Sequence, residues 1–555
     1  MCGESSSKRD SPGVGRTGRA PVRSARRGLP LTLASAISTG PGPFALAIGV
    51  AALALVSCGE AGEAPSRPPR IILVSMDTVR ADHVGGVGAA ATTPALAGIA
   101  GQGVTLQNFY AASSFTLPSH MSIFTGLDPI EHGVWREEAE LNPNVFTLAQ
   151  ILGADGYETA AFHEGGYVAP RYGFDRGFET YTEFPRVDVV DGSLSMVTDW
   201  IRDHRGDRYF LFVHTYAAHY PYGGWERYRE AGGVAGRLDD SDVSGLRQRW
   251  DDAHARRQEG RAPEEVPPAV RSRCTLYNQL AETHGELLGC GDNFLSIETL
   301  DSEYAEADLA AIRDGYDARI GQIDRALAQI RETLESLGEW DDTLLVITAD
   351  HGEAFLEHGS AQHDYIPFDE VMRVPAILSY PRLLRAGGVR EIQEATWHLD
   401  LMPTILGLAG IEFPGRSRGV DLSSVLRGES SLRGDRTVHP AVLRLAHREP
   451  KPPRRVAVRG RLKYIEGDAA FGDERGLLFD LEEDPGEVQN LRASRADDFR
   501  ALEDSTTAWR AALEPQPARH RTSGRPLSTD PEVTVPEIEL SPRQRQTLKE
   551  LGYVD

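Results

Sequence analysis

Three short segments carry residue types that together could hold a metal ion and attack an anion. The first is an apolar run that ends in Asp77-Thr78, and the last is the apolar run Leu344–Thr348, followed closely by Asp350-His351. Between them, Thr116 stands directly before Leu117-Pro118, at a predicted helix start. Carboxylate and imidazole groups are common ligands of divalent cations, and a coordinated cation makes a nearby hydroxyl a better nucleophile. These residues suit a displacement at a tetrahedral anion.

The predicted helix start gives Thr116 a second useful property. Backbone amides of a first helical turn have no partner within the helix, and the helix dipole favours negative charge beside them. An isolated threonine at such a position would be an ordinary helix N-cap. The flanking acidic motifs at Asp77 and Asp350 are what turn Thr116 into a candidate nucleophile, because a threonine hydroxyl is too weak an acid to act unaided.

The elements that must position these residues alternate along the chain. Apolar runs of strand length alternate with segments of helical spacing, which predicts an α/β fold with a large, mostly parallel central sheet sandwiched by helices. The expected strands are Ile71–Ser75, Val104–Phe109, Glu158–Phe162, Tyr209–Val213, Leu344–Thr348 and Val374–Leu378, and the expected helices are Thr93–Gly101, Ser119–Thr125, Thr147–Leu152 and Leu309–Leu337. Ligands of such sheets lie beyond the carboxyl ends of the strands, where Asp77, His214 and Asp350 would gather.

Beyond residue 430 the sequence pattern changes from alternating strands and helices to strands joined by tight turns. The segment from Val456 to Ile465 predicts a hairpin that turns at Arg459-Gly460, and Gly476–Asp480 is expected to add a strand. We therefore expect a small antiparallel C-terminal subdomain. The predicted organisation is a signal peptide at 1–57, a tether at 58–69, a catalytic α/β domain at 70–430 with an insertion at 223–300, the subdomain at 431–510, and a proline-rich tail with a terminal helix at 511–555.

The N-terminus predicts export. A basic stretch precedes an apolar run too short for a comfortable membrane span, and the run ends in Leu-Val-Ser-Cys58, the pattern of a bacterial lipobox. We expect an exported lipoprotein, periplasmic or on the cell surface, that meets the membrane only through a lipid on Cys58; an uncleaved anchor is the alternative. In such a compartment a disulfide between Cys274 and Cys290 is plausible.

The net charge limits the partners. A formal charge of -23 argues against nucleic acid or an anionic membrane surface as an electrostatic partner. It leaves room for a basic pocket inside an acidic surface, so the total charge says little about the substrate.

Motifs in the right order over about residues 70–495 make the chain resemble the sulfatase family, within the alkaline-phosphatase-like superfamily. The matching segments are Ile71–Asp82, Thr116–Gly126, His219-Tyr-Pro-Tyr222, Asp350–Glu353, Phe368–Pro375, Asp400–Thr404 and Leu478–Pro485. The resemblance implies that Asp77, Asp350 and His351 are metal ligands. It also implies that Thr116 is the nucleophile and touches the metal.

Further roles follow from the same resemblance. His219 would contact the transferring group or protonate the leaving oxygen. His363 stands near the place of a lysine that holds the anion in many relatives, and it would bind the anion or a second metal. His120 stands where the family usually has arginine, in the catalytic region. His214 is a core residue or a functional one, and Arg373 is expected to brace the core.

The chain also departs from the family pattern. Sulfatases carry cysteine or serine at the position of Thr116, and that residue is oxidised to formylglycine. Threonine cannot form this aldehyde, so no formylglycine is expected. Threonine combined with Asp350-His351 resembles the phosphatase, phosphodiesterase and phosphonate-hydrolase branches of the superfamily. Carboxylates alone suit Ca²⁺ or Mg²⁺, whereas His351 shifts the preference toward Zn²⁺ or Mn²⁺.

The sequence supports three interpretations. The first is a metal-dependent hydrolase of sulfate or phosphate esters that works through a covalent threonine intermediate, with phosphodiester or phosphonate monoester hydrolysis as its variant. Its expected partner is a sulfated or phosphorylated small molecule or glycan. The second is a phosphoethanolamine-type transferase, but such relatives carry several membrane spans and this chain has one apolar run. The third is a non-catalytic glycan-binding lipoprotein, and the retention of Asp77, Asp350 and His351 argues against it.

Overall fold

The computed structural model describes most of the chain from residue 70 to residue 521. The described ranges are 70–88, 93–184, 191–219, 302–363, 365–385, 387–413, 415–443 and 453–521. They all belong to the second of two compact units, Met1–Ala61 and Gly62–Asp555. The predicted signal peptide and tether, the 223–300 insertion with its two cysteines, and the terminal helix lie outside the described residues. The predicted domain boundaries stay predictions.

The centre of the fold is an eight-stranded sheet with the order β12-β2-β11-β8-β1-β7-β5-β6. Its core strands are long apolar runs because both faces are covered, and nearly all their side chains are buried. The bounds are β1 Arg70–Met76, β2 Val104–Leu106, β5 Glu158–His163, β6 Thr180–Glu183, β7 Tyr209–Thr215, β8 Thr343–Thr348, β11 Ala376–Ser379 and β12 Glu391–Ile392.

The pairing confirms the predicted fold class of a mostly parallel sheet. Strand β1 pairs in parallel with β7 on one side and with β8 on the other. Strand β11 is the exception, because it runs antiparallel to both of its neighbours, β8 and β2. The run Val374–Leu378 therefore does form a strand, although it runs against the others. Predicted strand Val104–Phe109 divides into β2 and the short β3, Phe109–Tyr110.

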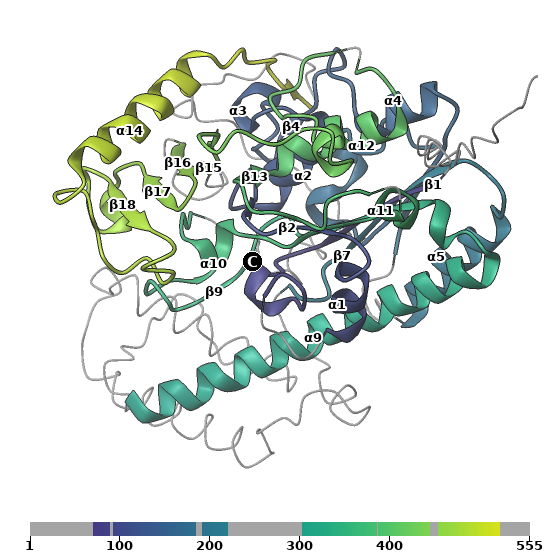
Figure 1. The fold of residues 1–555 in the computed structure, drawn as a ribbon, viewed down its shortest axis with the longest axis horizontal. Coiled ribbons are helices and arrows are strands. Elements are labelled where there is room, and N and C mark those ends of the chain that lie inside the picture. The colour runs from purple at the N-terminus through teal and green to yellow at the C-terminus, as the bar shows by residue number, and fades with distance from the viewer. Residues whose placement is uncertain are drawn as a thin grey trace, which may run out of the picture. The chain divides into compact units, whose positions relative to one another are not determined.

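Helices cover the sheet as expected. The longest is α9, Ser302–Leu337, which packs against α1 and α5 and lies along one side of the molecule in Figure 1. It ends before Gly338, whose φ of 73° is left-handed and suits a glycine. The other helices are α1 Pro94–Ala100, α2 Thr116–Thr125, α3 Pro129–His132, α4 Leu148–Ala154, α5 Asp191–Asp203, α10 Asp369–Met372, α11 Pro381–Arg385, α12 Leu401–Ala409 and α13 Ser423–Leu426.

The predicted antiparallel C-terminal sheet is present. Its order is β14-β16-β17-β18, and β15 also pairs with β16. The predicted hairpin is β16 Arg454–Arg459 and β17 Leu462–Ile465, with Gly460 in the turn at a φ of 56°. Helix α14, Ala496–Ala511, packs on β16 and β17 (Figure 1). The remaining strands are β14 Thr437–Val438, β15 Ala441–Val442 and β18 Leu477–Asp480.

Short elements complete the described part of the chain. They are β4 Ala139–Glu140, β9 Ala354–Phe355, β10 Ala361–Gln362, β13 Thr396–Trp397, β19 Arg519–His520 and the 3-10 turns η1 Ala81–His83, η2 Gly166–Val168, η3 Pro170–Tyr172, η7 Trp340–Asp342, η8 His398–Asp400 and η9 Ala469–Phe471. Among the described residues, no helix combines the length and apolar character needed to cross a membrane.

Candidate active site

The candidate site lies at the carboxyl edge of the sheet, beyond its central strand. Asp77 directly follows β1, and its backbone amide donates to the carbonyl of Thr215 at the end of β7. Asp350 and His351 follow β8, on the other side of β1. Since the three strands are parallel neighbours, their ends bring residues that are hundreds of positions apart into contact, as the sequence predicted.

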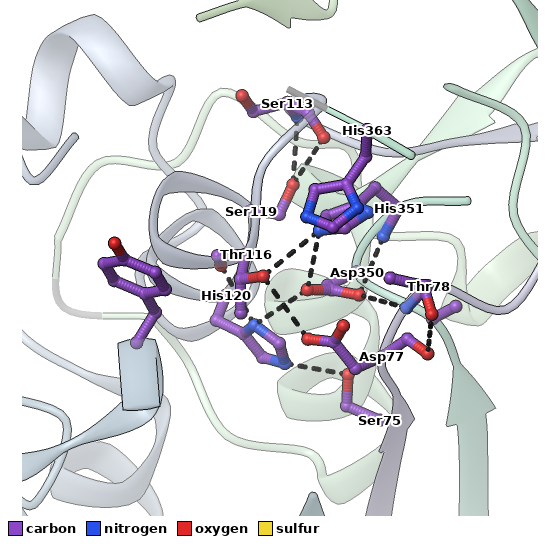
Figure 2. A network of polar contacts seen from close by, with 12 residues as sticks. Ser75, Asp77, Thr78, Ser113, Thr116, Ser119, His120, Asp350, His351 and His363 are labelled. Carbon is purple, nitrogen blue, oxygen red and sulfur yellow. Dashed lines mark hydrogen bonds and ion pairs between the residues drawn. The ribbon is translucent and has the colours of Figure 1, made fainter. Parts of the chain in front are cut away.

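Helix α2 places Thr116 over this edge. The helix begins at Thr116 itself, with Phe115 as its N-cap, so it starts three residues before the predicted Ser119 and Thr116 is its first helical residue. The hydroxyl Oγ1 of Thr116 lies 3.3 Å from Asp77 Oδ2 and 3.1 Å from His351 Nε2. Figure 2 shows these side chains and Asp350 directed toward one another.

The residues present fit a divalent cation. One ligand atom each from Asp77, Asp350 and His351 lie within 4.8 Å of one another, and the described part of the chain holds no other such group. Asp77 Oδ1 and Asp350 Oδ2 are buried and accept no hydrogen bond. Two buried carboxylates with free oxygens are costly unless a cation neutralises them. The sulfatase-type expectation of a metal at these ligands therefore agrees with the geometry.

Protonation states around the site support the same conclusion. The ring Nδ1 of His351 lies 3.0 Å from the carbonyl of Gly352, so Nδ1 carries the proton and Nε2 presents its lone pair to Thr116. Burial lowers the pKa of His351 to about 4, which keeps this ring neutral. Burial and the adjacent charge of Asp350 raise the pKa of Asp77. A bound cation would oppose that rise by favouring both carboxylates in their charged form.

Thr78 links the two acidic motifs. Its φ of 59° is left-handed, a strained conformation for a β-branched residue. The conformation is held because the Thr78 amide donates to Asp350 Oδ1 at 3.2 Å and the hydroxyl lies 3.0 Å from the carbonyl of Ala218. Tyr316 of α9 donates to the carbonyl of Thr78 at 2.7 Å. Thr78 thus holds Asp350 in place, and its own side chain adds no carboxylate to the two of Asp77 and Asp350.

His120 lies on α2 itself, one helical turn after Thr116. Its Nδ1 donates to the carbonyl of Thr116 at 3.0 Å, and its Nε2 accepts from Ser75 Oγ at 2.8 Å (Figure 2). Nδ1 also lies 3.5 Å from Asp350 Oδ2. Burial lowers the pKa of His120. Both ring nitrogens contact protein groups, so this ring ties α2 to β1 rather than offering a free nitrogen to a substrate.

His219 and His363 lie beside the predicted metal ligands. The ring of His363 is 4.2 Å from that of His351 and 5.1 Å from that of His219, measured between centroids. His363 Nδ1 lies 3.2 Å from Glu353 Oε1. This carboxylate orients the His363 ring, so that Nε2 points away from Glu353. His363 therefore lies beside the predicted ligand His351, and His219 lies beside His363, while their predicted roles toward the substrate stay predictions.

The two residues with less definite predictions are also placed. His214 on β7 is buried, and its Nε2 lies 3.6 Å from Asp77 Oδ2, so it is a neighbour of the site. Arg373 donates twice to the carbonyl of Gln107, at 2.8 and 3.2 Å, and braces the chain as expected.

Sequence reasoning did not identify Ser75, Thr78, Tyr316 and Glu353 as site residues. Ser75 and Glu353 stand two positions from predicted ligands, and the alternation of a strand could have flagged Ser75 as facing the same side as Asp77. Tyr316 gives no such signal, because its contact with Thr78 spans 238 residues of sequence.

A mostly parallel sheet with a buried Asp, Asp, His and Thr cluster at its carboxyl edge defines a metal-dependent ester hydrolase of the alkaline-phosphatase-like kind. Residues 69–411 match the family model described as sulfatase, and residues 357–504 match the model described as N-sulphoglucosamine sulphohydrolase, C-terminal. The chain belongs to the sulfatase family. It is thus an enzyme of the class that hydrolyses sulfuric or phosphoric esters.

Curated relatives include glycan sulfatases. The chain is 25% identical over 444 residues to an N-acetylglucosamine-6-O-sulfatase of Bacteroides thetaiotaomicron, with 71% of this chain and 77% of that protein covered. It is 23% identical over 471 residues to a Delta 4,5-hexuronate-2-O-sulfatase of the same species, with 79% and 87% covered.

Solved structures share the fold. A phosphonate monoester hydrolase of Agrobacterium radiobacter matches with a TM-score of 0.60 and 21% identity, over 80% of this chain and 96% of that one. At this identity the likeness speaks for the fold alone.

Proposed function

We propose that the protein is an exported hydrolase that cleaves sulfate esters of a glycan or small molecule through Thr116. The observation that carries this proposal is the position of the Thr116 hydroxyl, 3.3 Å from Asp77 Oδ2 and 3.1 Å from His351 Nε2 at a helix N-terminus. The sulfated glycan as substrate class is supported by the names of the two curated relatives.

In this proposal Asp77, Asp350, His351 and Thr116 hold the cation. When bound, the cation supplies Lewis-acid chemistry that lowers the pKa of the hydroxyl and polarises the ester. His351 as a ligand favours Zn²⁺ or Mn²⁺ over Ca²⁺ or Mg²⁺.

The chain's own residues then carry out the displacement. Thr116 Oγ1 gives its proton to Asp77 Oδ2, which lies 3.3 Å away, and forms a bond to the sulfur, while the bond from sulfur to the ester oxygen breaks. The departing oxygen takes a proton from His219, and His363 contacts the anion. The amides of the first turn of α2 favour the charge on the non-bridging oxygens. Water then attacks the sulfur, the bond from sulfur to Thr116 Oγ1 breaks, and Oγ1 regains a proton as sulfate leaves. The ring of His120 positions Thr116 by donating a hydrogen bond to the Thr116 backbone carbonyl.

A second candidate substrate has its own supporting observation. Thr116 cannot be oxidised to formylglycine, and a threonine nucleophile paired with Asp350-His351 suits attack at phosphorus as well as at sulfur. Phosphodiesters and phosphonate monoesters present the same single negative charge as a sulfate ester. The same residues would perform the same steps on them, with a phospho-threonine intermediate.

The experiment is a side-by-side assay of aryl sulfate, phosphate monoester, phosphodiester and phosphonate ester with added Mn²⁺, Zn²⁺, Ca²⁺ or Mg²⁺. We expect metal-dependent turnover of the aryl sulfate, and a preference for the phosphorus esters would favour the second candidate. Thr116→Val should lower kcat on the order of 10³-fold or more, whereas Thr116→Ser keeps the hydroxyl and part of the activity. Unchanged turnover by Thr116→Val would exclude Thr116 as nucleophile, and binding of sulfated glycan without any turnover would favour the non-catalytic lipoprotein.

The location is a further part of the proposal. A lipid on Cys58 would tether the mature protein to a membrane, as the lipobox pattern suggests. Mass spectrometry of the membrane fraction tests this, with Cys58→Ala as the unlipidated comparison.

A further inference from the structure

The loop that carries the predicted ligand His351 is bonded to a short helix of the catalytic domain. The amide of Gly352 donates to the carbonyl of Val371 at 2.8 Å, and the amide of Glu353 donates to the carbonyl of Glu370 at 3.0 Å. The approach is so close that a Cβ on Gly352 would meet the Glu370 carbonyl oxygen at 2.1 Å. The position of α10, Asp369–Met372, therefore determines where the backbone after His351 can lie.

Helix α10 is in turn fixed by two charged residues of the C-terminal region. Lys463 Nζ donates to Asp369 Oδ1 at 2.6 Å and also lies 2.8 Å from Glu487 Oε1. Glu487 Oε2 accepts from the backbone amide of Asp369 at 2.6 Å. One ammonium and one carboxylate thus hold both the side chain and the backbone of the first residue of α10.

Lys463 stands on the apolar face of the C-terminal sheet. In β17 it pairs with Val458 on one side and Phe479 on the other. Val458 and Phe479 belong to the same buried cluster as Val371 and Met372 of α10. The Lys463 side chain has no exposed surface. A buried lysine in this setting costs desolvation that an apolar side chain would avoid.

Stability gives a weak reason for such an arrangement. Buried ion pairs are often no more stabilising than well-packed apolar residues of similar size, and one of their best-attested uses is to fix a unique register. Here the register in question is that of α10 against the sheet, and α10 carries the two carbonyls that hold the loop after His351.

We propose that Lys463 is a positioning residue of the metal centre. It acts through Asp369, the first residue of α10, and through Glu487, which holds the Asp369 amide. The C-terminal sheet thereby helps to set the orientation of His351. This inference rests on the proposed role of His351 as a ligand, but its structural link can be tested without turnover.

The test uses the full chain and a variant that removes all three charges together, Lys463→Met with Asp369→Asn and Glu487→Gln, so that no lone charge is left buried. Lys463→Arg is the conservative comparison. The control is Arg461→Met, because Arg461 lies on the same hairpin but is about half exposed and pairs with Asp480 and Glu482 instead. Folding is checked by circular dichroism.

Three measurements decide the outcome. The triple variant should bind Mn²⁺ or Zn²⁺ about 10- to 100-fold more weakly, as is typical when groups behind metal ligands are removed. The visible spectrum of its Co²⁺ form should shift, and the Gly352 and Glu353 amides should exchange hydrogen faster. Lys463→Arg should recover part of each effect, and Arg461→Met should match the wild type.

A folded triple variant with wild-type metal affinity, Co²⁺ spectrum and amide exchange would overturn the inference. If the wild type bound no metal at all, the proposed function would fail instead. In that case the amide exchange of Gly352 and Glu353 would still decide whether Lys463 positions the loop: faster exchange in the triple variant supports it, and unchanged exchange refutes it.

Discussion

The backbone amide of Thr78 donates a hydrogen bond to Asp350 Oδ1 at 3.2 Å, and so ties the end of β1 to the end of β8. The bond occupies one carboxylate oxygen and leaves Oδ2 without a hydrogen-bond donor. Thr78 makes this bond while its backbone is in the left-handed conformation, with a φ of 59°. Strain of this kind costs of order 1–3 kcal/mol and persists where surrounding contacts enforce it. Here it aligns two acidic residues for one cation.

The first prediction compares two replacements of Thr78. Thr78→Val keeps the branched shape and the strain but loses the hydroxyl contact with Ala218, so we expect a loss of about 1–2 kcal/mol in unfolding free energy. Thr78→Gly loses the same contact but relieves the left-handed strain, so its loss should be smaller. Urea denaturation measures both. A glycine variant that is less stable than the valine variant would show that the strain relieved at Thr78 is smaller than the backbone entropy and buried side-chain contacts that glycine gives up.

The second prediction concerns Tyr316, whose hydroxyl donates to the Thr78 carbonyl and accepts from the Arg80 amide at 2.9 Å. Tyr316→Phe leaves two buried backbone groups unpaired, which should cost about 1–3 kcal/mol. Because these groups belong to the chain that directly follows Asp77, metal affinity should also fall several-fold in calorimetric titration. Tyr181→Phe is the control: its hydroxyl bonds to the Val168 carbonyl at the far edge of the sheet. Equal metal affinity in both variants would contradict the prediction.

The residues at the strand ends could be predicted because local patterns specify them. The apolar runs before Asp77 and Asp350 are buried strands, and a parallel sheet must bring their ends to one edge. Pro118 marked the helix that carries Thr116. Even the contact of His120 with the Thr116 carbonyl follows from a spacing of four residues in a helix.

The parts that could not be predicted depend on distant partners. Lys463 and Asp369 are 94 residues apart, and neither has a local feature that marks the pair. The left-handed Thr78 has no signal either, since threonine disfavours that conformation and only the folded surroundings enforce it. The run Val374–Leu378 predicts a strand, but its composition gives no sign that β11 runs antiparallel to β8 and β2.

The third prediction concerns the ion pair between Arg455 and Asp128. The two side chains are buried and meet through two hydrogen bonds, at 2.7 and 2.8 Å, and Asp128 also accepts from the Ile130 amide at the start of α3. Arg455→Met strands a buried carboxylate and should lower the unfolding free energy by about 3–5 kcal/mol. Adding Asp128→Asn to the Arg455→Met variant should lower the unfolding free energy much less than Asp128→Asn does in the wild type. Additive losses in a double-mutant cycle would show that the pair is not coupled.

The fourth prediction is a loss of stability in acid caused by buried neutral histidines. The Nδ1 atoms of His132, His163 and His398 accept backbone amide hydrogens from Val134, Gly165 and Ala112. An Nδ1 that accepts cannot carry a proton, and burial lowers the pKa of each ring to about 3. Unfolded histidine titrates near 6.5, so between pH 6.5 and pH 3 the unfolded chain binds more protons than the folded one.

Because the unfolded chain binds more protons, the folded protein loses stability as the pH falls. The stability contribution of each ring is complete above pH 6.5 and is lost as the pH falls, by about 2 kcal/mol per ring at pH 5. Urea midpoints should therefore drop steeply from pH 7 to pH 5. His132→Asn keeps an acceptor in place of Nδ1 but cannot be protonated, so it should remove about 2 kcal/mol of that drop. The control is His204→Asn, because His204 lies just beyond the end of α5 and its side chain is partly exposed. An undiminished drop in His132→Asn would mean that His132 is charged in the folded protein.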